Sequence, residues 1–169
     1  MFLRRPPGGP LSRSDPNSSP ERNADTRIND GAPMTYLAAY LSTLVVFGII
    51  DAGWLSTMGN ILYRPLLGDL LAPSVRIIPA IAFYLVYPAG LVIFVVLPAL
   101  REGTWQGTFL YGALFGAVAY ATYDLTNQAT LRTWPLQITL IDIAYGAVAS
   151  GLAAMLAVVA VRWLTVAHG

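Results

Sequence analysis

The chain has 169 residues, of which 56% are hydrophobic and 11% are charged, and its mean hydropathy is +0.58. This balance is far from that of a soluble domain and indicates an integral membrane protein. The net charge of +1 gives no basic excess that would favour nucleic acid, and the absence of lysine excludes Schiff-base chemistry. The absence of cysteine excludes disulfides and thiolate catalysis, and a single histidine cannot form a multi-histidine metal site.

Residues 1–33 are rich in Pro, Gly, Ser, Arg and Asp and contain few aliphatic residues, so they cannot bury enough surface to offset chain entropy. We expect a disordered N-terminal tail, without the pattern of a secretory signal. Met34 directly precedes the first apolar run. Two interpretations therefore stay open: the tail is a cytosolic extension, or Met34 is the true start and the tail is an over-long gene start.

Four apolar segments follow in residues 34–169, each near the roughly 20 residues that a helix needs to cross about 30 Å of hydrocarbon. They are residues 35–58, 77–100, 104–127 and 135–158. None alternates polar and apolar residues as a barrel strand would. The sequence therefore predicts an all-α integral membrane four-helix bundle. Aromatic residues typical of membrane interfaces stand near the segment ends: Trp54, Tyr63, Trp105, Trp134 and Trp163.

The arginines indicate how the bundle is oriented. Near the segment ends, Arg22, Arg27, Arg101 and Arg162 belong to the side of the termini, and Arg64, Arg76 and Arg132 to the other side. Because cytoplasmic loops carry the arginine excess, we expect both termini in the cytoplasm.

Three of the four segments carry one aspartate each: Asp51, Asp124 and Asp142. Counting the helix rise from the segment ends puts Asp51 and Asp142 roughly 10 Å deep and Asp124 roughly 5 Å deep. Since consecutive crossings are antiparallel, all three lie in the leaflet opposite the termini. We expect them to form a polar cup beneath the first and third loops.

Small residues recur every four positions on the same helix faces as the aspartates, and such stripes let helices approach closely. The stripes are Gly112, Gly116, Tyr120 and Asp124 on the third segment and Asp142, Gly146, Ser150 and Ala154 on the fourth. On the first segment, Tyr40, Leu44, Gly48 and Asp51 form the corresponding line. We expect Gly112, Gly116, Gly146 and Ser150 to make helix contacts, either within one bundle or between copies in a homo-oligomer.

Polar partners for the carboxylates stand nearby. Tyr84 and Tyr87 lie one turn apart next to Pro88, and their hydroxyls can donate to a carboxylate or simply occupy the membrane interface. Asn127 follows Asp124 by one turn. Carboxylates that lie close together favour binding a proton or a cation. Alternatively, Arg64, Arg76 and Arg132 neutralise all three.

The stretches "MTYLAAYLSTLVVFGIIDAGWL", "LYRPLLGDLLA" and "GALFGAVAYATYDLTNQATLRTWPLQITLIDIAYG" resemble the bacterial membrane-protein family catalogued as domain of unknown function 2177. The resemblance runs from Met34 to about Val161 and implies a prokaryotic inner-membrane protein of four helices. It carries no established activity, cofactor or metal. The motif positions are Asp51, Trp54, Tyr123, Asp124, Asn127, Trp134 and Asp142.

Three function classes remain. The leading hypothesis is a small binding or transport component in the lipid bilayer, whose acidic cup takes up a cation, a proton or an amine-bearing solute at Asp51, Trp54, Tyr84, Tyr87, Tyr123, Asp124, Asn127 and Asp142. The second is an intramembrane enzyme acting on a lipid or isoprenoid, although the chain contains no HExxH, nucleophile-elbow or aspartate-rich metal motif. The third is a structural accessory subunit of a membrane complex. No catalytic residue and no cofactor is assigned.

Overall fold

The computed structural model describes the backbone of residues 20–167 and the side chains of residues 33–166. The larger part of the predicted disordered tail lies outside the residues described in this way, and its remainder, from Pro20, belongs to the first helix. The chain divides into two units, residues 1–34 and residues 35–169. The side-chain contacts and cavities described below all belong to the second unit.

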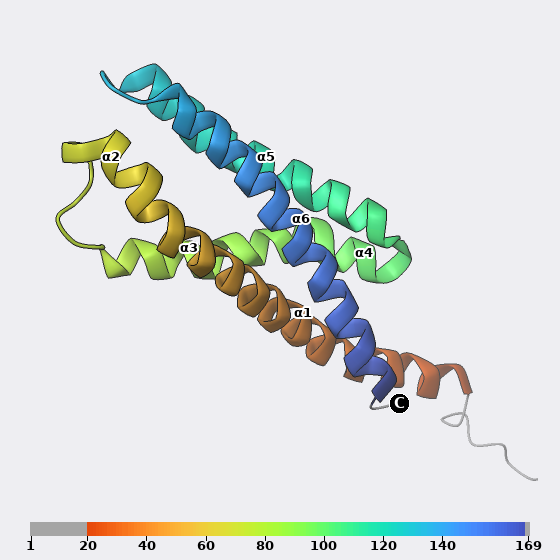
Figure 1. Cartoon of the computed structure of the whole chain (residues 1–169). Coiled ribbons are helices and arrows are strands. Elements are labelled where there is room, and N and C mark those ends of the chain that lie inside the picture. The colour runs from red at the N-terminus through yellow and green to blue at the C-terminus, as the bar shows by residue number, and fades with distance from the viewer. Residues whose placement is uncertain (1–19, 168–169) are drawn as a thin grey trace, which may run out of the picture. The chain divides into compact units, whose positions relative to one another are not determined.

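All regular structure in the described residues is helical and forms four successive helical segments (Figure 1). The first contains α1 (Pro20–Met58), the π-helix η1 (Gly59–Tyr63), α2 (Arg64–Leu67) and the 3-10 helix η2 (Gly68–Leu70). The second contains α3 (Ile77–Leu91), the π-helix η3 (Val92–Val96) and α4 (Leu97–Glu102). The third is α5 (Trp105–Thr130) and the fourth is α6 (Leu136–Ala167). The predicted all-α four-helix bundle is confirmed.

Three of these segments are long and apolar enough to cross a membrane: Pro33–Leu70, Ile77–Glu102 and Leu136–Val166. Helix α5 has 26 residues, which is long enough, but its glycines, tyrosines, threonines and Asp124 make it less apolar than the other three. A helix of this composition needs neighbours to cover its polar face. Helix α6 is such a neighbour, as its contacts with α5 show.

The first helical segment is longer than the sequence predicted. We expected the crossing to end near Met58 and a loop to follow, whereas helical structure continues to Leu70. The π-helix η1 directly precedes the proline of α2, and this widened turn accommodates Pro65, whose ring would clash with the carbonyl group one turn earlier in a regular helix. The helix stops where Gly68 adopts a φ of 48°, which glycine tolerates without steric cost.

Helices α5 and α6 lie against each other through their backbones. A Cβ atom placed on Gly112 would lie 2.8 Å from the carbonyl oxygen of Ser150, and one placed on Gly116 would overlap the carbonyl oxygen of Gly146. On α6, a Cβ at Gly146 would overlap the ring of Tyr120. Gly112 and Gly116 therefore serve the contact inside the chain, so an association between copies would use another face.

The buried face of α1 is shifted by one residue from the predicted stripe. The structure buries Ala39, Thr43, Phe47 and Asp51, which recur every four residues. Gly48, which we expected on this face, would have open space around an added Cβ. The aromatic ring explains the difference, because Phe47 is fully buried and its ring centroid lies 4.8 Å from that of Tyr87 on α3.

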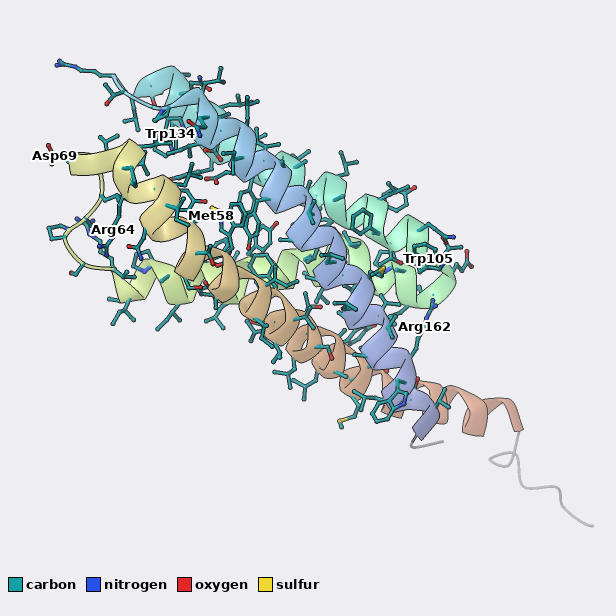
Figure 2. The ribbon with its side chains drawn as sticks, viewed as in Figure 1. Met58, Arg64, Asp69, Trp105, Trp134 and Arg162 are labelled. Carbon is teal, nitrogen blue, oxygen red and sulfur yellow. The ribbon has the colours of Figure 1, made fainter. Side chains whose placement is uncertain are left out.

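Arg162 of α6 forms hydrogen bonds with the C-terminal end of α4. Its guanidinium donates hydrogen bonds to the carbonyl oxygens of Ala99 (2.9 Å) and Gly103 (3.0 Å). These carbonyls stand at a helix C-terminus, where a cation is favourable. Figure 2 shows Arg162 and Trp105 at one end of the bundle and Trp134, Arg64 and Asp69 at the other.

We predict that Gly116→Ala lowers the stability of the purified protein by about 1–3 kcal/mol, because the new methyl group would force α5 and α6 apart. The matched control is Gly48→Ala, where the methyl group meets nothing within 4 Å. The control should leave stability unchanged or raise it by up to about 1 kcal/mol through helix propensity. Unfolding in detergent, followed by circular dichroism, measures both. Equal effects of the two substitutions would contradict the close backbone contact.

Candidate binding site

Asp51 is a buried carboxylate held by two tyrosines from different helices. Its side chain is 5% exposed. Tyr84 of α3 donates a hydrogen bond to one carboxylate oxygen (2.5 Å), and Tyr145 of α6 donates to the other (2.9 Å). Each carboxylate oxygen can accept a further hydrogen bond. The two tyrosines therefore fix the orientation of the carboxylate without supplying a positive charge to balance it.

A cavity of about 300 Å³ opens beside this carboxylate. Six of its nine lining residues are aromatic, and Asp51 is its only charged residue. The lining comprises Asp51, Trp54, Leu55, Tyr63, Ala80, Phe83, Tyr84, Tyr120 and Tyr145. We call this space the carboxylate cavity. Its walls combine one negative charge with aromatic rings, whose faces carry partial negative charge.

Trp54 connects the carboxylate cavity to a second aspartate. Its indole ring stacks on the ring of Tyr145 with centroids 4.1 Å apart and planes inclined by 11°. The Trp54 Nε1 donates to the hydroxyl of Tyr63 (2.9 Å), which in turn donates to a carboxylate oxygen of Asp142 (2.5 Å). A continuous set of side-chain contacts thus joins Asp51 and Asp142 through Tyr145, Trp54 and Tyr63.

The π-helix η1 ends at Tyr63, the residue that makes this connection possible. A π turn holds more residues than an α turn and so rotates the residues after it around the helix axis. Tyr63 is consequently turned toward both Trp54 and Asp142. The same irregular turn that accommodates Pro65 also completes the hydrogen-bonded chain.

Asp124 of α5 is fully buried, and neither of its carboxylate oxygens has a hydrogen-bond partner. The buried indole nitrogen of Trp134 also lacks a partner; it lies near enough to act on the carboxylate but outside hydrogen-bonding geometry. Asp142 is close enough to interact with Asp124 electrostatically. A buried polar group without a partner costs free energy, so Asp124 is a candidate for binding a proton or a cation.

The structure divides the predicted site residues into groups rather than one cup. Asp51, Trp54 and Tyr84 line the carboxylate cavity, whereas Asp124 and Asp142 form a neighbouring acidic pair that does not line it. The remaining predicted residues lie outside the lining of the carboxylate cavity. Tyr87 shares a hydrogen bond of 2.6 Å with Ser150, Tyr123 is 60% exposed and packs edge-on against Trp134, and the carbonyl oxygen of Asn127 accepts from the amide of Leu131.

The arginines take no part in these contacts. Arg64, Arg76 and Arg132 are all exposed. The hydrogen-bond donors to Asp51 and Asp142 are tyrosines, and the polar group near Asp124 is the indole N–H of Trp134. The alternative in which arginines neutralise the three aspartates is therefore wrong for this part of the chain.

Sequence reasoning did not identify Tyr63, Phe83, Tyr120 and Tyr145 as residues of the cavity. From the sequence, Tyr63 is an aromatic residue typical of membrane interfaces and Tyr120 is part of a packing stripe. Tyr145 follows Asp142 by three residues, but its partner is Asp51 on another helix. A pairing between distant segments leaves no trace in local spacing, so no signal in the single sequence pointed to it.

The carboxylate cavity combines one acidic side chain with aromatic rings. In the described part of the chain, no three His, Cys, Asp or Glu side chains gather as a metal-binding group. Aromatic faces attract cations such as ammonium groups. The fold and this cavity together define a helical membrane protein with a buried acidic and aromatic site.

Residues 36–159 match a family described as "Predicted membrane protein (DUF2177)", and the chain belongs to this family. The resemblance recognised in the sequence is thereby confirmed. No curated protein and no solved structure matches the chain.

Asp51 has two tyrosine donors and Asp124 has none, so we predict that substituting them changes the stability of the protein differently. Asp124→Asn should leave stability unchanged or raise it, because it removes a buried charge that has no basic partner. Asp51→Ala should lower stability by about 1–3 kcal/mol, because two tyrosine hydroxyls lose their acceptor. Thermal unfolding in detergent measures both. A larger loss for Asp124→Asn than for Asp51→Ala would show that Asp124 has a stabilising partner after all.

Proposed function

We propose that this chain is a membrane-embedded binding or transport component for a small organic cation that carries an ammonium group. The observation that supports this most strongly is the buried Asp51 carboxylate, which faces an aromatic cavity and has tyrosines but no arginine as partners. A cationic ligand would supply the balancing charge. Removing a carboxylate from water is costly, and this cost is offset when a cation binds to it.

The aromatic lining supports an ammonium over a hydrated metal ion. A cation near the face of Trp or Tyr is stabilised by about 0.5–2 kcal/mol, with the larger value at desolvated sites. Trp54, Tyr63, Tyr120 and Tyr145 line the space beside the single charged residue. A volume of about 300 Å³ is at the lower end of the range for small-molecule sites, which favours a compact head group.

The neighbouring acidic pair supports a role for protons in the same protein. Asp124 has no hydrogen-bond partner, and Asp142 reaches the carboxylate cavity through Tyr63 and Trp54. A carboxyl group that gains or loses a proton would change the charge near the cavity. We propose that proton binding at this pair accompanies cation binding at Asp51.

We further propose that the protein resides in the bacterial inner membrane with both termini in the cytoplasm, and that α5 crosses beside α6 as a fourth span. The distribution of the arginines supports the orientation, and the close backbone contact at Gly112 and Gly116 supports the fourth span. A single four-helix chain is slender for a conduit. We therefore propose a homo-oligomer as the transporting form.

The test is binding of choline to the purified protein in nanodiscs, followed by tryptophan fluorescence, with 3,3-dimethyl-1-butanol as the uncharged analogue of the same shape. We expect choline to bind and the neutral analogue not to bind. Asp51→Asn should weaken choline binding at least about tenfold, because it removes the charge and keeps the side-chain shape; tenfold corresponds to about 1.4 kcal/mol.

Asp69→Asn is the matched control for this test. Asp69 lies in η2, is exposed and lines no part of the carboxylate cavity, so the same change of charge should leave choline binding unaltered. Equal binding of choline and its neutral analogue, or an equal effect of the two substitutions, would contradict the proposal and favour a structural role for the polar network.

A further inference from the structure

A second cavity, of about 390 Å³, lies between α3 and α5. It is lined by Phe83, Tyr87, Ala119, Tyr120 and Tyr123. Phe83 and Tyr120 also line the carboxylate cavity, so the two spaces share walls. None of its lining residues is an aspartate, a glutamate or an arginine. We call this space the apolar cavity.

The apolar cavity offers mostly carbon surface to a ligand. The hydroxyl of Tyr87 is already hydrogen-bonded to Ser150. Phe83 and Tyr123 are 38% and 60% exposed, so the cavity is reached from the outside of the bundle. In a membrane-spanning bundle that outside is hydrocarbon, and a ligand could enter from the bilayer without passing through water.

Another hydrophobic space lies next to the apolar cavity along α5. A further cavity of about 370 Å³ shares Ala119 with the apolar cavity and is otherwise lined by residues of η3 and α5: Phe94, Val95, Tyr111, Leu114, Phe115 and Val118. We call these two cavities together the groove. Their lining residues on α5 run from Tyr123 to Tyr111, which is roughly 18 Å at the rise of an α-helix. This length accommodates a long alkyl chain.

We propose that the ligand is an amphiphilic cation taken from the bilayer, with its ammonium head beside Asp51 and its alkyl chain in the groove between α3–η3 and α5. The inference rests on the proposed function and adds the class of ligand. Charge complementarity places the head, since Asp51 is the only charged residue of the carboxylate cavity. The two cavities share Phe83 and Tyr120 in their linings, so they are adjacent, and this supports placing the alkyl chain in the apolar cavity.

Ala119 lies where a substitution would affect only the binding of the ligand's alkyl chain. It lines both the apolar cavity and its continuation along α5, but not the carboxylate cavity. A larger side chain at this position would block the groove and leave the space for the head group open. The position therefore separates binding of the chain from binding of the head.

The experiment measures displacement of radiolabelled tetramethylammonium from protein in nanodiscs by tetramethylammonium itself and by dodecyltrimethylammonium. On the unaltered protein, we expect dodecyltrimethylammonium to displace the radiolabel at a concentration at least about tenfold lower than tetramethylammonium does. Ala119→Phe should abolish this advantage while tetramethylammonium still binds. Should Ala119→Phe fail to fold, Ala119→Leu serves as the smaller obstruction, and it should reduce the advantage.

Ala82→Phe is the matched control, because Ala82 lies on α3, is exposed and lines none of these cavities. It should retain the advantage of the dodecyl compound, which also accounts for simple partitioning of that compound into the bilayer. An advantage that is absent, or that survives Ala119→Phe and Ala119→Leu, would overturn the amphiphile inference while the binding of small cations stands. Absence of tetramethylammonium binding by the unaltered protein would overturn the proposed function itself.

Discussion

The main physical constraint on this structure is that a membrane bundle buries carboxylates in its interior without a basic partner. Asp51 meets this constraint with two tyrosine hydroxyls, and Asp142 meets it with one. These hydrogen bonds orient the carboxylates but leave their charge unbalanced. A hydrogen bond from a neutral donor recovers only part of the solvation that a charged group loses on burial. This residual cost is the physical reason for proposing a cationic ligand in the carboxylate cavity.

The contacts between helices fix the positions of the carboxylates. The glycines of α5 and α6 bring the two backbones together, and Asp124 and Asp142 lie on those same helices as neighbours. Helix α3 contributes Tyr84 to Asp51 and, with α5, leaves room for the apolar cavity. Helix α5 thus packs closely against α6, and this helix pair carries Asp124 and Asp142. Toward α3, the same helix lines the apolar cavity.

The number and type of helices could be predicted from the sequence because apolar runs near 20 residues have few alternatives in a membrane. Helix spacing also indicated Asp51 and Tyr84, and the family resemblance indicated Trp54; these three residues share a cavity. It did not identify Tyr145, whose partner lies on another helix, or Tyr63, whose direction depends on a π turn. On α1 the expected face was one residue off, because the bulk of Phe47 outweighed the small-residue pattern that includes Gly48. Local spacing thus predicts which helices form, whereas side-chain partners follow from packing between them.

The most direct test of a cation site at Asp51 is a crystal structure with tetramethylarsonium, whose arsenic atom scatters anomalously and replaces the nitrogen of tetramethylammonium. We expect one anomalous peak inside the carboxylate cavity, close to the Asp51 carboxylate and beside the rings that line the cavity. Crystals of the Asp51→Asn variant should lack this peak. A peak that persists in the variant, or a cavity without any peak in the unaltered protein, would contradict the account.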